Sequence, residues 1–449
     1  MKSLLTVRHE ITLFLLLLLA VFFYLHNDIT KTAKYVKSEN CADCHESLFQ
    51  AWQQHTLHPH MFRPVESEAD IQADFTQNNP VVSFTLKDIE FVIGNKWEQV
   101  YARMIDGEYY PLPAKWMITT QKWVPYKVNT WRQTPLSTQC NGCHTTGFNP
   151  DTYEFSEFGI GCEACHGPGS LHVQQKKQQL NIECSICHQN DLETQQKTII
   201  VSVKNSVCGQ CHSRGQQTVD NEHMQTSYRF PLNMVPGDDL PTSYQTLTEN
   251  KDKDRKFWWG NGLSKNRHQE FADFSVSKHS LALKLLKEKH SDIRGKLTDD
   301  CLSCHSADYI LAKNKKDVTL LNAENGLTCV VCHEPHGLNR KFQHLNSNEH
   351  RCGLCHADSI SIKAAKTGKP HTPCPPSAAS CADCHMPYIV KSGGAYPIRS
   401  HAFKIVPPVA TKKYDVPNSC QNGGCHQDKS LDWATSNFQS YYPNWQENQ

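Results

Sequence analysis

The sequence predicts a mainly α-helical and irregular fold whose core is not built chiefly from apolar side chains. Its 449 residues suffice for two or three ordinary domains. Only 38% of them are hydrophobic and the mean hydropathy is −0.57, which is low for a chain that must bury so large a core. The chain also contains 21 Cys and 25 His. Its formal net charge of +1 gives no electrostatic reason to expect nucleic acid as a partner.

The cysteines follow one repeated pattern. Nine copies of Cys-x-x-Cys-His begin at Cys41, Cys140, Cys162, Cys184, Cys208, Cys301, Cys329, Cys352 and Cys381. The composition alone predicts about 0.05 copies. A tenth segment, from Cys420 to His426, has four residues between its cysteines instead of two. These ten segments, called sites 1 to 10 in chain order, use 20 of the 21 cysteines.

The pattern is that of covalent haem attachment. Two thiols one helical turn apart add to the two vinyl groups of a haem, and the following His becomes the proximal ligand of the iron. The sequence therefore predicts about ten haem c groups with their iron, which replace apolar side chains in the core. The thioether cysteines are Cys41, Cys44, Cys140, Cys143, Cys162, Cys165, Cys184, Cys187, Cys208, Cys211, Cys301, Cys304, Cys329, Cys332, Cys352, Cys355, Cys381, Cys384, Cys420 and Cys425. The proximal histidines are His45, His144, His166, His188, His212, His305, His333, His356, His385 and His426.

Two other uses of paired cysteines explain the pattern less well. Ten pairs are enough for five four-Cys zinc sites, and an exported chain can carry a disulfide scaffold. Neither gives a reason for a His directly after every pair. The lone Cys374 has no partner cysteine and is interpreted as an incidental free thiol rather than a nucleophile.

The remaining histidines are numerous enough to supply a second axial ligand to most irons. Fifteen are left, and two of them, His9 and His26, lie in or beside the N-terminal apolar segment, which leaves 13. Irons with two His ligands carry electrons and have no open position for a substrate. His172 and His336 are the strongest candidates from spacing, because each lies too close to the preceding proximal His to reach that same iron. His279 lies in a helix-like run from His268 to His290.

The sites are grouped along the chain. The expected organisation is a signal anchor at 1–33, site 1 with a β-rich insertion at 34–139, and a four-site module at 140–212. A connecting region with a ligand helix follows at 213–300, then a second module with sites 6 to 10 at 301–426 and a tail at 427–449. The phrases around Cys162 and Cys329 echo each other, which indicates two related haem-packing modules.

The N-terminal segment indicates export. Residues 11–25 form one apolar run after Lys2 and Arg8, and its length suits a signal-peptide core or a short membrane anchor. No Ala-x-Ala cleavage site follows, which favours an uncleaved anchor. The positive residues before it predict that the haem part lies on the periplasmic side of the bacterial inner membrane. If the segment is cleaved, the protein is periplasmic.

Three stretches carry no attachment site. Residues 80–135 have a β-like texture, with Val81–Leu86 and Glu90–Ile93 as expected strands among many aromatic residues, and predict a small β-rich insertion. Residues 213–265 contain turn formers and the charged run Lys251–Lys256, and a solvated loop is expected there. The tail at 427–449 contains no recognisable functional motif.

With these motifs in view, the chain resembles the multihaem cytochrome c superfamily with the cytochrome c-552/4 domain. The resemblance covers most of 38–426 and rests on Trp52 before His58, Ile93–Tyr101, Cys140–Phe148, Gly161–Ser170, Phe274–His279, Cys384–Pro387 and Arg399–Phe403. It implies haems stacked in parallel and perpendicular pairs and mostly helical connections. It also implies that the distal ligands are His58, His172, His279, His336, His371 and His401. Further candidates come from the remaining spare histidines: His60, His223, His268, His290, His344 and His350.

The chain departs from the catalytic relatives in this superfamily. The pentahaem nitrite reductases, whose closing motifs are similar to Cys384–Pro387, carry a Cys-x-x-Cys-Lys site, whereas all ten sites here end in His. The preferred function is therefore an electron carrier in a periplasmic respiratory pathway, supplied by redox proteins or a quinol-side donor. The alternative is a reductase or oxidase of a small nitrogen or sulfur oxyanion at one open haem, for which Tyr101, Arg103, Arg214 and Arg229 are candidate residues. An extracellular wire of haem subunits is a third reading, which an uncleaved anchor argues against.

Overall fold

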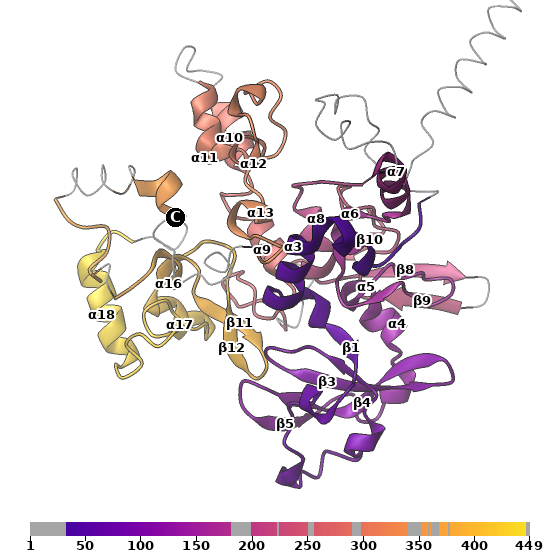
Figure 1. The fold of residues 1–449 in the computed structure, drawn as a ribbon. Coiled ribbons are helices and arrows are strands. Elements are labelled where there is room, and N and C mark those ends of the chain that lie inside the picture. The colour runs from indigo at the N-terminus through magenta and orange to yellow at the C-terminus, as the bar shows by residue number, and fades with distance from the viewer. Residues whose placement is uncertain are drawn as a thin grey trace, which may run out of the picture.

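The structure, a computed structural model, describes residues 33–180, 199–221, 224–249, 256–289, 298–338, 352–357, 360, 368–375 and 378–445. Short helices and small antiparallel sheets alternate along it (Figure 1). The expected anchor at 11–25 and all of site 4 lie outside the described residues. Within those residues, no helix is both long and apolar enough to cross a membrane.

Most attachment sites lie on one turn of helix, which sets their two thiols on the same face because residues three apart are neighbours on a helix. Sites 1, 2, 3 and 5 belong to α3 (Glu39–His55), α5 (Asn141–His144), α6 (Cys162–His166) and α8 (Ser206–His212). Sites 6, 7 and 9 belong to α11 (Leu302–His305), α13 (Cys329–Cys332) and α16 (Cys381–His385). Residues 352–357 of site 8 are also helical.

Site 10 has a different local structure. Its four-residue spacer forms turns rather than a helix, and both of its glycines, Gly423 at φ 67° and Gly424 at φ 93°, are left-handed. Glycine adopts such angles without the penalty that a Cβ imposes. The longer spacer is thus accommodated as a bulged loop between the two cysteines.

The other helices connect the sites or carry further histidines. They are α4 (Leu136–Gln139), α7 (Ser170–Leu180), α9 (Glu270–Ser275), α10 (Ala282–Lys289), α12 (Ala307–Leu311), α17 (Pro408–Tyr414) and α18 (Leu431–Tyr441). The expectation of one helix-like run from His268 to His290 is wrong, because α9 ends at Ser275 and α10 begins at Ala282. His279 lies in the break between them.

The largest sheet has five antiparallel strands in chain order: β1 (Phe62–Pro64), β2 (Phe91–Ile93), β3 (Gln99–Ile105), β4 (Glu108–Met117) and β5 (Lys122–Pro125). It lies at one end of the molecule (Figure 1). Apolar clusters cover both faces, one around Tyr101 and Trp116 and one around Phe62. The sheet begins before the predicted stretch, and Val81–Leu86 is not a strand, because it forms a turn and the start of the 3-10 helix Leu86–Asp88.

Three smaller sheets complete the fold. In the connecting region, β8 (Gly215–Asn221) lies between β9 (Met224–Tyr228) and β10 (Tyr244–Thr246), so the expectation of a solvated loop over 213–265 is wrong for these residues. Near the C-terminus, β11 (Tyr388–Ser392) pairs with β12 (Ala395–Arg399) over an apolar cluster that includes Ile389 and Val416. The pair β6 (Thr145–Thr146) and β7 (Glu157–Phe158) lies beside site 2.

Candidate multihaem centre

The structure places five proximal histidines opposite five histidines from other parts of the chain. In each pair the ring centroids are 5.9 to 6.4 Å apart. The pairs are His45 with His172, His166 with His336, His333 with His401, His356 with His279, and His385 with His371. The distal partners are five of the six histidines that the sequence singled out.

This separation is too large for ring stacking and suits a metal between the rings. Two metal–nitrogen bonds of about 2 Å, plus the half-widths of two imidazoles, give a centroid separation of about 6 Å. The angle between ring planes varies from 8° for His371–His385 to 89° for His279–His356. The shared feature is therefore the distance, as expected for two ligands on opposite sides of one iron.

Hydrogen bonds hold several of these rings by the nitrogen that would not bind iron. The Nδ1 atom of His166 lies 2.7 Å from the Ile200 carbonyl oxygen, and that of His401 lies 3.1 Å from the Arg399 carbonyl oxygen. The Nδ1 atom of His336 lies 2.9 Å from a Glu334 carboxylate oxygen. An Nδ1–H donor leaves the Nε2 lone pair available to a metal, and such contacts orient ligating histidines in many metal sites.

The sixth preferred candidate, His58, lies near the proximal His212 of site 5. Burial, together with the charge of the nearby His212, lowers the pKa of His58 to about 4. On the other ring, Nδ1 of His212 lies 3.5 Å from Glu270. His58 begins the 3-10 turn His58–His60, and Arg63 donates to the carbonyl of His60 at 3.3 Å.

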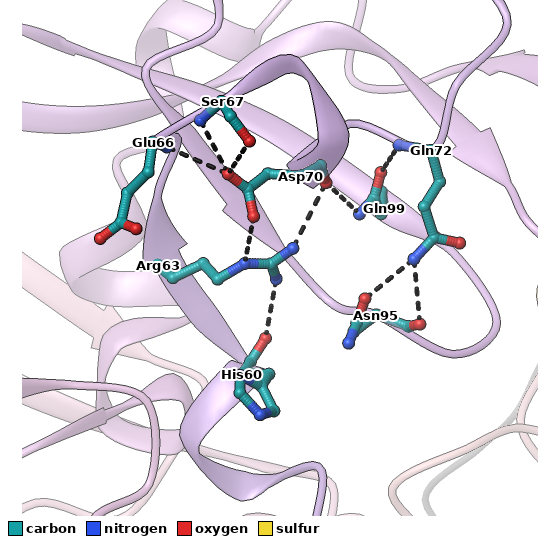
Figure 2. Close-up of polar contacts among 8 residues, drawn as sticks. All are labelled: His60, Arg63, Glu66, Ser67, Asp70, Gln72, Asn95 and Gln99. Atoms are coloured by element: carbon teal, nitrogen blue, oxygen red, sulfur yellow. Dashed lines mark hydrogen bonds and ion pairs between the residues drawn. The ribbon is translucent and has the colours of Figure 1, made fainter. Parts of the chain in front are cut away.

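The same arginine joins this turn to the sheet (Figure 2). Arg63 also donates to the side chain and the carbonyl of Asp70, and Asp70 accepts from the backbone N–H groups of Glu66 and Ser67. The carbonyl of Asp70 in turn accepts from Gln99 of β3 at 2.9 Å. This network fixes the turn that carries His58 against the rigid five-stranded sheet.

Four proximal histidines show a different environment. Within the described part of the chain, no second imidazole makes a ring contact with His144, His212, His305 or His426. Nδ1 of His144 lies 3.4 Å from the Met61 carbonyl oxygen, and Nδ1 of His305 lies 3.0 Å from the Ala282 carbonyl oxygen. The ring of Trp433 lies 5.0 Å from that of His426.

The further candidates separate into three groups. Nε2 of His60 lies 2.9 Å from the Gln53 carbonyl oxygen, which occupies the nitrogen that a haem iron would need. His268, at a left-handed φ of 62°, is buried near His144, Arg267 and Arg214. His223, His290, His344 and His350, like Cys184, Cys187 and His188 of site 4, lie outside the described residues.

The described sites lie close to one another. The sulfur atoms are neighbours in the pairs Cys41 and Cys162, Cys143 and Cys211, Cys208 and Cys329, Cys304 and Cys355, and Cys352 and Cys381. Gln210 of site 5 donates to the Ala164 carbonyl of site 3 at 3.1 Å, and Ser419, which precedes site 10, donates to the Cys384 carbonyl of site 9 at 2.9 Å. Each described site therefore lies beside at least one other.

These residues fit covalently attached haem. Each paired proximal ring follows two cysteines, and the described cysteines of the sites form no disulfide. Some buried polar atoms without a partner lie beside the sites, among them Nε of Arg214 and both side-chain polar atoms of Asn141. Because buried polar groups in native proteins are almost always hydrogen-bonded, such orphans indicate groups that complete the site.

Several supporting residues were not predicted from the sequence. Glu163, within site 3, is 2% exposed and accepts hydrogen bonds from the backbone N–H groups of Val36, Lys37 and Gly169. Tyr442, in the tail that showed no chemistry, donates to the His371 carbonyl at 3.1 Å. In the sequence, a charged residue inside an attachment motif cannot be told from an ordinary surface residue. The role of Glu163 could therefore not be predicted from its local sequence.

A buried ion pair connects the sheet to the region around site 2. Glu98 contacts Lys115 of β4 at 3.0 Å and Arg267 at 2.5 Å, and only 8% of its side chain is exposed. Burial raises the pKa of Glu98, but Arg267 and Lys115 outweigh burial and leave it below its usual value of 4.5. The ionised carboxylate therefore stabilises the folded chain.

Replacement of Glu98 by glutamine is expected to lower the free energy of unfolding at pH 7 by about 3 kcal/mol, since it removes the buried carboxylate that pairs with two partly buried cations. Because the folded pKa is depressed, this contribution is present above the unfolded value of 4.5 and is lost as the pH falls through the folded value. Denaturant unfolding of both proteins at pH 7 and pH 4 measures the difference. Glu66→Gln, at an exposed position of the same lobe, is the control. An equal difference at both pH values would contradict the prediction.

Comparisons with known proteins agree with this geometry. The family model "Cytochrome c554 and c-prime" matches residues 118–167 and 265–337. Among solved structures, an outer cell wall cytochrome, OcwA, is 28% identical, with a TM-score of 0.74 over 91% of this chain and 87% of its own. An undecahaem cytochrome from the S-layer of Carboxydothermus ferrireducens is 19% identical, with a TM-score of 0.50 over 92% of this chain and 60% of its own. No curated protein sequence matches the chain. The fold is thus that of multihaem cytochromes, and the similarities imply covalent haem c and electron transfer.

Proposed function

We propose that the protein carries electrons through about ten haem c groups, most of them held between two histidines. Haem supplies the one-electron redox chemistry when bound. The chain attaches each group through two cysteines, orients the ligand rings through their Nδ1 contacts, and brings neighbouring sites into contact. The observation that carries the proposal is the set of five histidine pairs at 5.9 to 6.4 Å.

The proposed place of action is outside the cytoplasm. Export is supported by the apolar segment at 11–25 with positive residues before it, and two similar structures are described as proteins of the outer cell wall and the S-layer. Anchored on the periplasmic side of the inner membrane, or periplasmic after cleavage, the protein would receive electrons from a redox protein or a quinol-side donor in a respiratory pathway. Nucleic acid is not a proposed partner.

A second candidate function is reduction or oxidation of a small nitrogen or sulfur oxyanion at site 2. Arg214 and Arg267 lie close to each other and to His268, and Arg267 lies near His144. Such a group of cations suits an anion. Arg214 and Arg229 from the sequence analysis belong to this group. Tyr101 donates to Gln99 in the sheet core and Arg103 pairs with Asp88 on the sheet, so neither supports this function.

One experiment tests both functions. A pyridine haemochrome count of the purified protein and its EPR spectrum in the oxidised state are expected to show about ten haems and a majority of low-spin signals. Azide is then added. An unchanged spectrum with no high-spin component favours transfer alone. A high-spin signal that azide converts to low spin favours the oxyanion site, and a spectrum dominated by high-spin iron would overturn the carrier proposal.

A further inference from the structure

The short segment Arg399–Phe403 contacts ligand groups of three sites. The Arg399 guanidinium donates to the carbonyls of Ala382 and Met386, at 2.8 and 3.0 Å, and to Asp383 at 2.6 Å, which ties it to the site 9 helix α16. Two residues later, the His401 ring lies opposite the site 7 ligand His333. The segment therefore connects the attachment helix of one site to the ligand of another.

The third contact comes from Phe403. Its ring centroid lies 4.2 Å from that of His279, and His279 lies opposite the site 8 ligand His356. The Phe403 ring also packs against Phe274 of α9, at 6.3 Å between centroids. Any displacement of this segment would thus reach sites 7, 8 and 9 together.

One buried carboxylate holds the segment in place. Asp273 of α9 is 3% exposed. Its Oδ2 atom accepts from the Ser400 hydroxyl at 2.8 Å and from the His401 N–H at 3.1 Å. Its Oδ1 atom accepts from the N–H of Ser264 at 3.2 Å and from the Ser264 hydroxyl at 2.5 Å. All four contacts are donated to the carboxyl group, so both of its oxygens are occupied as acceptors.

The arrangement requires a carboxylate rather than an amide. A backbone N–H faces each oxygen of Asp273, one from Ser264 and one from His401, and neither can reverse its direction. An asparagine would turn its NH2 group toward one of these donors in either orientation and leave a buried donor unsatisfied.

We propose that Asp273 is a positioning residue that fixes His401 as an axial ligand and sets the reduction potential at site 7. This inference rests on the proposed function. The backbone contact to His401 and the Nδ1 contact of the same residue to the Arg399 carbonyl together determine the ring orientation. Outer contacts of this kind orient a ligating ring and tune the reduction potential of the iron that it binds.

The test compares Asp273→Asn with the wild-type protein. One low-spin EPR signal is expected to shift its g values, and one midpoint in a spectroelectrochemical titration is expected to move, with the haem count unchanged. The matched control is Asp88→Asn, because Asp88 also accepts a backbone N–H, from Thr85 at 2.8 Å, but in the 3-10 helix Leu86–Asp88. Spectra and midpoints identical to the wild type, or the same change in Asp88→Asn, would overturn the inference.

A milder variant is used if the Asp273→Asn protein does not fold or does not incorporate haem. Ser400→Ala removes one of the four donors to Asp273 and is expected to move the same signal in the same direction by a smaller amount. No movement in this variant counts against the inference. Failure of the proposed function is seen separately, because a wild-type spectrum without low-spin signals would appear before any variant is compared.

Discussion

Replacement of His336 by alanine is expected to convert one low-spin haem signal to high spin and to leave the others unchanged. The His336 ring lies 6.0 Å from the proximal His166, with the two planes at 15°. Glu334 holds His336 through Nδ1, and the Ile200 carbonyl holds His166 in the same way. The Nε2 atom of each ring is therefore left to bind a metal between the two rings. The alanine substitution would remove one of these two strong-field ligands.

The control for this variant is His60→Ala. Nε2 of His60 is hydrogen-bonded to the Gln53 carbonyl, so its loss is expected to leave every haem signal in place. Oxidised EPR and the absorption band of high-spin haem near the red end of the spectrum report on both variants. A new high-spin signal in His60→Ala, or none in His336→Ala, would show that the pairs are assigned wrongly.

Replacement of Glu163 by glutamine is expected to have the largest effect on stability, about 3 kcal/mol or more. Both oxygens of Glu163 accept backbone N–H groups: Lys37 donates to Oε2 at 2.8 Å and Gly169 donates to Oε1 at 2.7 Å. An amide would place an NH2 group against one of these donors. The segment after Val36 leads to site 1, and the segment after Gly169 leads to α7, which carries His172.

The same substitution is expected to disturb the His45–His172 pair, since Glu163 joins the chain segments that carry both rings. Denaturant unfolding measures the stability loss, and the low-spin EPR signals show whether one pair is affected. Glu154→Gln, an exposed position near the same site, is the matched control. Equal unfolding midpoints for the two variants would contradict the role assigned to Glu163.

The sequence predicted the attachment motifs better than the scaffold around them. The spacing of Cys-x-x-Cys-His is a local property, so each site could be located from a few residues. The break between α9 and α10 could not, because Phe271, Phe274, Ala282 and Leu285 keep a helical spacing across it. Val81–Leu86 has strand-like composition, yet its apolar side chains pack on the sheet cluster from turns.

The contacts that pair and hold the histidine rings could not be predicted either, because they also depend on residues far apart in the chain. Which histidine faces which is decided by segments far apart in the chain, so the pairs of His172 and His336 with their proximal partners depend on the tertiary fold. The carboxylates of Asp273 and Glu163 likewise gain their importance only where distant backbone groups converge on them. Glu334, in contrast, lies two residues before His336 in the sequence. Its contact with the His336 ring could therefore have been predicted from the local sequence.

The pairing of His166 with His336 has a consequence for biogenesis. His166 belongs to the first group of sites and His336 follows a site of the second group, so the two groups are interlocked rather than independent. During synthesis the early attachment sites are made before the later residues that complete them. Long-range closures of this kind fold slowly and expose unfinished surfaces. We therefore expect haem ligation to depend on most of the polypeptide, so that fragments cut between the two groups do not incorporate haem separately.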